Sequence, residues 1–461
     1  MKKYNRFSQI SILFLLLGVM SAGAFGQSRK DRDAAKKLQE AADKAFSAKN
    51  YREAVDKYGQ SVALVSTNAL AHYRKGFAHY NLQENIEALN EFATALSQGY
   101  KPLEIYKIRT YIYYETKNFD AALAEVNKAL ALTPNDLILL KSSGEINLGR
   151  NAYSAALDSF NKAAQLAPKD GDIYYNIARI HLGLGDPKSQ ADNAEKALAN
   201  GTRFVGETYY LLGEAHQRMR NAGPAIDAYQ KAINSKPDLL QAYRNLSELY
   251  RSENRFSDAI NTSKQGLKLF PNDGNLFTDL SWYYSLAGDP GRAIDAAKAG
   301  IQLLPNQSMA YTNLCRAYNE TKSFELAITA CNGALRVAPN DGETFFYLGN
   351  AYVQSNKSAD ATKAYARAVT GLLEYTTKNP AYSDGWYLLG NAYFADRQFE
   401  KAIAAYLKCL SLSPKFTRAM ANLGICYTRV KNKAAATAQY NKLLQADPAL
   451  AARVKAELDK M

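Results

Sequence analysis

Apolar residues recur along most of this chain with the spacing of paired amphipathic helices. In residues 240–273, Tyr243, Leu246 and Tyr250 are three and four positions apart, so they share one face of a helix. A short polar stretch follows, and a second apolar pattern then runs until Pro271. Proline ends a helix because it lacks an amide donor and disfavours helical geometry at the residue before it. The stretch therefore predicts two packed helices joined by a tight turn.

The same unit recurs with a period of 34 residues. Three residue types mark the period: Ala225, Ala259, Ala293 and Ala327; Pro237, Pro271, Pro305 and Pro339; Tyr250, Tyr284 and Tyr318. With residue 240 counted as position 1, position 20 is usually alanine, and position 8 is glycine at Gly76, Gly144, Gly213, Gly349, Gly390 and Gly424. Small residues at both positions let paired helices approach closely. A generic helical bundle keeps no such fixed phase, so the pattern predicts a solenoid of helix-turn-helix repeats.

This pattern resembles the tetratricopeptide repeat family over about nine tenths of the chain. The resemblance implies an all-α, right-handed superhelical solenoid that binds other proteins. In this register about twelve repeats fill residues 35–448, starting near residues 35, 69, 103, 137, 171, 206, 240, 274, 308, 342, 383 and 417. Residues 27–34 read as a charged lead-in. Residues 449–461 read as an amphipathic capping helix, which a solenoid needs to cover its last repeat.

Two places depart from the period. Between residues 171 and 205 the spacing slips to 35, and Gln190 replaces the usual alanine. A hinge and ordinary drift of the repeat are the two interpretations, of which we favour drift. Residues 369–383 contain seven additional residues, about two helical turns. This insertion predicts a second helix that projects beyond its neighbours.

Residues 1–26 differ from the repeats. A basic start precedes an apolar run at residues 10–20 and small residues at 21–26, which is the order of a secretory signal peptide. The run is too short to span a bilayer well. Cleavage after Ala24 or after Gly26 fits the pattern, no cysteine is placed to form a lipoprotein anchor, and an uncleaved short anchor is the alternative. We expect an exported protein in the periplasm, or on the periplasmic face of the outer membrane, of a Gram-negative bacterium, with no transmembrane span in its mature chain.

The net charge of +13 adds little to the prediction of an exported repeat protein. Lys2, Lys3 and Arg6 leave with the signal peptide, which carries no acidic residue, so the mature chain keeps +10. This balance suits acidic partners in principle. The basic residues are scattered, however, and no basic block or groove-reading motif occurs, so together with export the sequence argues against nucleic acid as a partner.

All four cysteines lie in the last third of the chain. Cys315 and Cys331 fall on facing helices of one repeat, and Cys409 and Cys426 fall on helices of adjacent repeats that should touch. Disulfides Cys315–Cys331 and Cys409–Cys426 are therefore one hypothesis for an exported protein. Buried free thiols that pack as small residues are the other.

Nothing in the sequence indicates an active site. The four histidines occupy helix positions where the repeat usually buries a large side chain, so we interpret them as core residues: His72, His79, His181 and His216. No zinc-protease, paired-cysteine or serine-nucleophile motif occurs. Acidic residues are spread over helix surfaces without a convergent partner. The sequence predicts a protein that is not an enzyme and needs no metal or cofactor.

The resemblance implies that ligands lie along a concave face formed by the first helix of each repeat, at positions 2, 5, 6, 9, 12 and 13. In the second and third repeats these positions carry an N-terminal aromatic patch: Tyr73, Phe77, Tyr80, Tyr111 and Tyr114. Exposed aromatic side chains anchor protein interfaces. Burial of these rings against each other or against the lead-in is the alternative.

Farther along, the same face carries a series of arginines interspersed with glutamates: Arg179, Arg218, Arg244, Arg251 and Arg316. Asparagines recur at position 6 as Asn176, Asn245, Asn313 and Asn422, and at position 9 as Asn350 and Asn391. Side-chain amides can bind a peptide backbone, and mixed charge favours a polar or acidic peptide, although surface ion pairs explain the charges equally well. No three successive repeats supply the family's carboxylate clamp for acidic C-termini.

These observations predict an exported, non-enzymatic scaffold that binds client proteins or peptides along its concave groove, in cell-envelope assembly or secretion. The alternative is a binder of anionic glycans or envelope polysaccharide, with tyrosines stacking on sugars and arginines holding acidic groups. High ionic strength should abolish the second kind of binding and spare the first.

Overall fold

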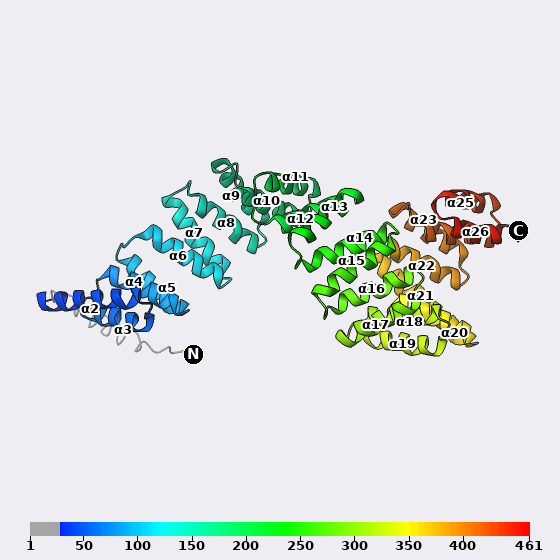
Figure 1. Cartoon of the computed structure of the whole chain (residues 1–461), viewed down its shortest axis with the longest axis horizontal. Coiled ribbons are helices and arrows are strands. Elements are labelled where there is room, and N and C mark those ends of the chain that lie inside the picture. Colours follow the sequence, from blue (N-terminus) through cyan, green and yellow to red (C-terminus); the bar gives the residue numbers. More distant parts are fainter. Residues whose placement is uncertain (1–27) are drawn as a thin grey trace, which may run out of the picture. The chain divides into compact units, whose positions relative to one another are not determined.

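A computed structural model describes residues 28–461, and all regular secondary structure in this range is helical. The predicted all-α class and helix-turn-helix arrangement are confirmed: within each of the two units described below, consecutive helices pack against one another (Figure 1). The signal peptide expected at residues 1–26 lies outside the described residues. Within residues 28–461, no helix combines the length and apolar character needed to cross a bilayer.

The chain forms two compact units that divide between Arg203 and Phe204. The division coincides with the place where the repeat spacing slips to 35 residues. In the first unit the helices are α2 (Arg29–Ser47), α3 (Tyr51–Leu64), α4 (Ala69–Asn81), α5 (Asn85–Ser97), α6 (Pro102–Glu115), α7 (Phe119–Leu132), α8 (Leu137–Gly149), α9 (Tyr153–Leu166), α10 (Gly171–Leu184) and α11 (Pro187–Ala199).

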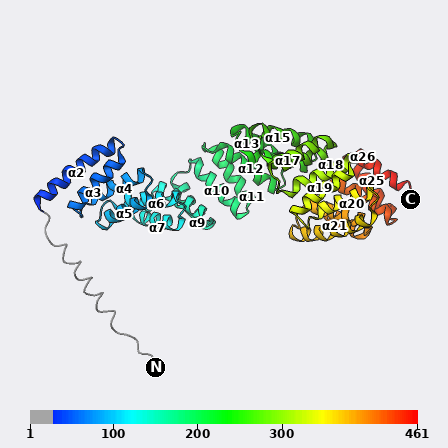
Figure 2. The same ribbon diagram turned by 90° about the horizontal axis from the view of Figure 1, so that it is seen from below.

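The second unit continues the same alternation of first and second helices (Figure 2). Its helices are α12 (Val205–Arg218), α13 (Ala222–Ser235), α14 (Leu240–Ser252), α15 (Phe256–Leu269), α16 (Gly274–Leu286), α17 (Pro290–Leu303), α18 (Ser308–Glu320), α19 (Phe324–Val337), α20 (Gly342–Gln354), α21 (Ser358–Lys378), α22 (Ser383–Ala395), α23 (Phe399–Leu412), α24 (Thr417–Arg429), α25 (Lys433–Ala446) and α26 (Pro448–Leu458).

The turn inside each repeat has a constant geometry. Position 15 takes a left-handed backbone with positive φ in every described repeat, most often at a polar residue and at glycine only in Gly185 and Gly288. The amide of the following residue closes the first helix, as when the Arg255 amide donates to the Tyr250 carbonyl at 2.8 Å. Such a left-handed ending satisfies the last carbonyl groups of a helix and reverses the chain within a few residues.

Position 8 of the first helix faces position 24 of the second, and the two residues fit each other by size. A Cβ atom on Gly213 would lie 2.6 Å from the fully buried ring of Tyr229, and Gly390 and Tyr406 are related in the same way. Other repeats fill this contact differently, for example with a 3.0 Å hydrogen bond from Ser263 to Ser247. Each glycine at position 8 therefore accompanies an aromatic residue at position 24, although Ala42 occupies position 8 beside Tyr58 in the first repeat.

Three parts of the structure depart from a regular repeat. Helix α2 begins at Arg29, with the Ser28 hydroxyl accepting from the Asp31 amide, so most of the predicted lead-in is the start of the first helix. Helix α21 has 21 residues where α19 and α23 have 14, as the seven-residue insertion predicts. Helix α26 buries Ala451, Val454 and Leu458 against α24 and α25 and so covers the last repeat.

A candidate binding cavity in the second unit

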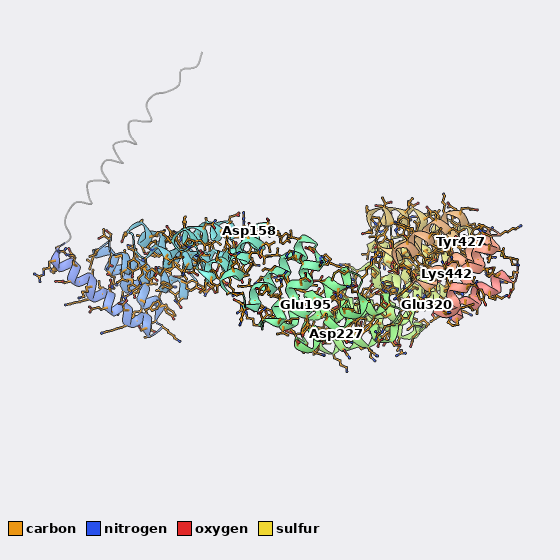
Figure 3. All side chains as sticks on the ribbon, turned by 90° about the horizontal axis from the view of Figure 1, so that it is seen from above. Asp158, Glu195, Asp227, Glu320, Tyr427 and Lys442 are labelled. Atoms are coloured by element: carbon orange, nitrogen blue, oxygen red, sulfur yellow. A yellow bond between two sulfur atoms is a disulfide. The ribbon has the colours of Figure 1, made fainter. Side chains whose placement is uncertain are left out.

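A cavity of about 1440 Å³ lies in the second unit, and side chains of α14 to α16, α18 to α24 and α26 line it, Glu320 of α18 among them (Figure 3). Most of its lining comes from the first helices α14, α16, α18, α20, α22 and α24, at positions 2, 5, 6, 9, 12 and 13 of each repeat. These are the positions expected on the concave face. The walls are rich in aromatic rings and side-chain amides, with charged groups between them.

Two polar contacts at the cavity join helices that are far apart in sequence. The Arg251 guanidinium on α14 lies 3.0 Å from the Asp384 carboxylate on α22. The Arg418 guanidinium on α24 donates to the Leu286 carbonyl at 2.9 Å. We call these two contacts the clasp. Because three repeats separate α14 from α22, the clasp connects the two sides of the groove that the intervening repeats line.

The Arg251 side chain is only 10% exposed, and carboxylates and an aromatic ring surround its guanidinium. It donates two hydrogen bonds to Glu248, at 2.6 and 2.8 Å, and its guanidinium stacks 4.3 Å from the ring centroid of Trp282. Carboxylates and an aromatic face together offset the cost of burying the charge. Arg251 is therefore held rigidly at the junction of the clasp.

Arg316 and Glu343 lie on the neighbouring helices α18 and α20 without a direct ion pair. Arg316, which is 8% exposed, donates to Asn313 at 3.2 Å, lies 5.8 Å from the ring centroid of Tyr347, and has a buried Nε with no hydrogen-bond partner. Burial raises the pKa of Glu343 to about 7; Arg316 opposes this rise, and the carboxylates of Asp341 and Asp384 add to it. Burial thus favours the neutral form of Glu343, and the charge of Arg316 only partly offsets this effect.

Three segments match models of a known family. Residues 73–136, 206–239 and 383–416 each match a tetratricopeptide repeat. The chain contains tetratricopeptide repeats. No curated protein matches the sequence.

Solved structures of tetratricopeptide repeat proteins align with the chain. A protein from Parabacteroides merdae is 14% identical over 55% of this chain and 97% of its own, with a TM-score of 0.45. The C-terminal part of a repeat protein from Cytophaga hutchinsonii is 18% identical over 61% and 98%, with a TM-score of 0.40. PilW, a type IV pilus biogenesis factor, is 17% identical over 46% of this chain and 99% of its own, with a TM-score of 0.41.

The asparagines predicted to bind a ligand have structural partners. At position 9, the side-chain oxygens of Asn350 and Asn391 accept the hydroxyls of Tyr365 and Tyr406, at 2.8 and 2.7 Å. The Asn422 amide at position 6 donates to Asn391 at 2.8 Å. Asn350, Asn391 and Asn422 all line the cavity, but they also tie neighbouring helices together.

The other asparagines at position 6 have structural partners as well. Asn245 donates to the Tyr210 hydroxyl at 3.1 Å, and Asn313 donates to the Thr278 carbonyl at 3.0 Å, in each case to the preceding repeat. Asn176 instead donates to the Asp172 carbonyl of its own helix. The recurrence of asparagine therefore has a structural explanation in the packing of successive tetratricopeptide repeats.

Of the five predicted arginines, Arg251 and Arg316 line the cavity and the other three do not. Arg244 forms an ion pair with Asp279 at 3.2 Å. Arg218 is exposed on α12. Arg179 belongs to the first unit, where it is exposed and donates to Asn176 at 2.8 Å. The arginines therefore do not form one continuous binding stripe.

The N-terminal aromatic patch lies in the first unit and is only partly a surface. Phe77 packs edge-on against the buried ring of Phe92, with centroids 5.2 Å apart, and Tyr73 contacts both rings. Tyr80 packs at the edge of the same core cluster, and Tyr114 packs against the next one. Tyr111 is the most accessible ring, at 48% exposed. The alternative, that these rings are buried against each other, describes Tyr73 and Phe77.

The two predicted cysteine pairs differ. Cys315 and Cys331 are joined as a disulfide across α18 and α19, at positions 8 and 24, with Cα atoms 5.2 Å apart. Cys409 and Cys426 are free and buried in one apolar cluster. Burial raises the pKa of both thiols to about 12, and because disulfide exchange proceeds through a thiolate, this environment disfavours bonding between them.

His72 and His79 pair with carboxylates, and His79 is the only buried histidine of the four, so the interpretation of all four as core residues holds for one. The His79 ring, 8% exposed, lies 2.7 Å from Glu84, and His72 lies 2.5 Å from Glu91. No group of three or more potential metal-binding side chains occurs among residues 28–461.

Several cavity residues were not singled out from the sequence. Glu343 and Tyr347 occupy positions 2 and 6 of α20, so the concave-face rule contained the signal for both. Tyr375 and Tyr382 arise from the insertion, whose place in the structure no repeat rule supplies. The two contacts of the clasp join residues several repeats apart, so no local sequence pattern predicts them.

Proposed function

We propose that the protein is an exported, non-enzymatic scaffold that holds a segment of a client protein in the cavity of its second unit, in the service of cell-envelope assembly or secretion. The cavity carries this proposal. Its volume of about 1440 Å³ exceeds that of most small-molecule sites, and its lining of aromatic rings and amides suits an extended chain. Protein binding is also the general role of tetratricopeptide repeats.

Two observations support export. Residues 1–26 have the order of a secretory signal peptide. The disulfide Cys315–Cys331 is a bond that persists in oxidising compartments outside the cytosol. Fractionation of the native host should place a chain shortened by its leader in the periplasm or on the outer membrane. Recovery of the full-length chain from the cytosol would contradict this part of the proposal.

Capture of clients tests the scaffold itself. Met309 lines the cavity and is 51% exposed, whereas Leu407 is 48% exposed and lies outside the lining. After crosslinking in the native host, the wild type and Leu407→Trp should retain the same client protein. Met309→Trp, which fills part of the cavity, should lose it. Recovery of polysaccharide alone, with binding that collapses at high salt, would favour the glycan alternative.

A further inference from the structure

One corner of the cavity differs from the rest in its chemistry. It contains the carboxyl groups of Glu343 and Asp384 together with the rings of Tyr375 and Tyr382, and we call it the acidic aromatic pocket. The two rings are in edge contact, with centroids 6.1 Å apart, and they remain 43% and 39% exposed. Large rings left accessible inside a cavity offer contact area to an occupant.

The insertion builds this pocket. The additional turns of α21 carry Tyr375, and the loop that follows carries Tyr382. A Cβ atom on Gly385 would lie 3.0 Å from the Tyr375 ring, so this ring rests on the start of α22 next to Asp384. The one repeat with a longer second helix thus supplies both exposed tyrosines of the pocket.

The charges around Glu343 are not balanced. Among the described residues, Arg316 is the arginine whose charge favours ionised Glu343, whereas Asp341 and Asp384 oppose it. The Asp384 carboxylate is shared with Arg251, which also serves Glu248. Glu374 at the rim already has Lys378 at 2.6 Å. The carboxylates of Asp341 and Asp384 therefore repel an ionised Glu343, and an added cation beside Glu343 would offset that repulsion.

We propose that the acidic aromatic pocket holds the lysine or arginine side chain of a bound peptide segment. The carboxylate of Glu343 would accept hydrogen bonds from the cationic group, and the tyrosine rings would contact its charged face or its aliphatic stem. This inference rests on the proposed function, because it names the chemistry of the segment that the cavity takes. It reverses the expectation of an acidic client that the predicted arginine series suggested.

Fluorescence anisotropy with the full-length protein tests the pocket. Three labelled peptides of the same glycine and serine backbone carry three lysines, three glutamines or three glutamates. The lysine peptide should bind at least about tenfold more tightly than the other two. Glu343→Gln should abolish that preference, while Glu400→Gln, which removes the same charge from the exposed surface of α23, should keep it.

Two substitutions of Tyr375 test the aromatic part of the pocket. Tyr375→Ala should weaken binding of the lysine peptide several-fold, and Tyr375→Phe should retain it, because the ring rather than the hydroxyl contacts the cation. Circular dichroism of each variant checks that the helices remain intact. Equal affinity of the wild type for all three peptides would overturn the cation pocket and leave the peptide-binding cavity standing. Failure of all three peptides to bind would overturn both.

Discussion

The clasp should couple two repeats that a simple solenoid leaves independent. In a repeat protein each unit contacts only its neighbours, so stability is nearly a sum of local terms. The ion pair between Arg251 and Asp384 spans 133 residues, and its side chains are only 10% and 12% exposed. We therefore expect the replacements Arg251→Met and Asp384→Ala to be strongly non-additive.

The expected coupling follows from the geometry of this pair. Removing one partner of a buried ion pair costs about 3–5 kcal/mol when the other is left uncompensated. Arg251 keeps its two hydrogen bonds to Glu248 when Asp384 is removed, so part of that cost is avoided. We expect a coupling energy of about 2 kcal/mol, within the range measured for residues in one polar network.

Urea unfolding followed by tryptophan fluorescence measures this coupling. The chain has two tryptophans, Trp282 and Trp386, and both belong to the second unit, so the signal reports the part of the chain that contains the clasp. The wild type, the two single variants and the double variant complete the cycle. Additive effects, within about 0.5 kcal/mol, would refute the idea that the clasp couples α14 to α22.

Three further predictions concern the packing and the charge of the repeats. Gly213→Ala should destabilise the protein by roughly 1–3 kcal/mol in urea unfolding, because its new methyl group meets a buried ring. Gly291→Ala, on the exposed side of α17 with its nearest neighbour at 3.9 Å, should instead gain up to about 1 kcal/mol. Cys331→Ser removes the disulfide to Cys315 and should lower the free energy of unfolding by about 3 kcal/mol relative to the oxidised wild type, but by little relative to the reduced wild type. Folding raises the pKa of Glu343 from 4.5 to about 7. As the pH rises between those two values, the free energy of unfolding of the wild type should therefore fall by up to about 3 kcal/mol, and that of Glu343→Gln should not. Parallel pH-dependent curves for both proteins would contradict this.

The repeat itself could be predicted from sequence because its constraints are local. Glycine at position 8 and alanine at position 20 mark where two helices touch, and the structure places Gly213 against the ring of Tyr229 as such a contact. The longer second helix, α21, also followed from counting residues. The period of the repeat and the length of each helix depend on residues close together in the chain, so both can be predicted from a single sequence.

The candidate site could be predicted only in part because it depends on contacts between distant repeats. The concave-face positions identified Arg251 and Arg316, which line the cavity, but equally Arg179 and Arg218, which do not. Whether such a side chain faces open solvent or an enclosed cavity depends on the curvature of the whole unit. A partner such as Asp384, more than a hundred residues away, does not follow from any one repeat.

Site-specific photo-crosslinking tests the central claim, that the cavity of the second unit holds a client segment. A photoreactive residue replaces either Met309 in the cavity wall or Leu407 on the outer surface, and mass spectrometry identifies peptides joined to each in the native host. The cavity position should yield one recurrent client peptide that contains lysine or arginine, and the outer position should yield none. The same peptides from both positions, or none from the cavity, would contradict the account.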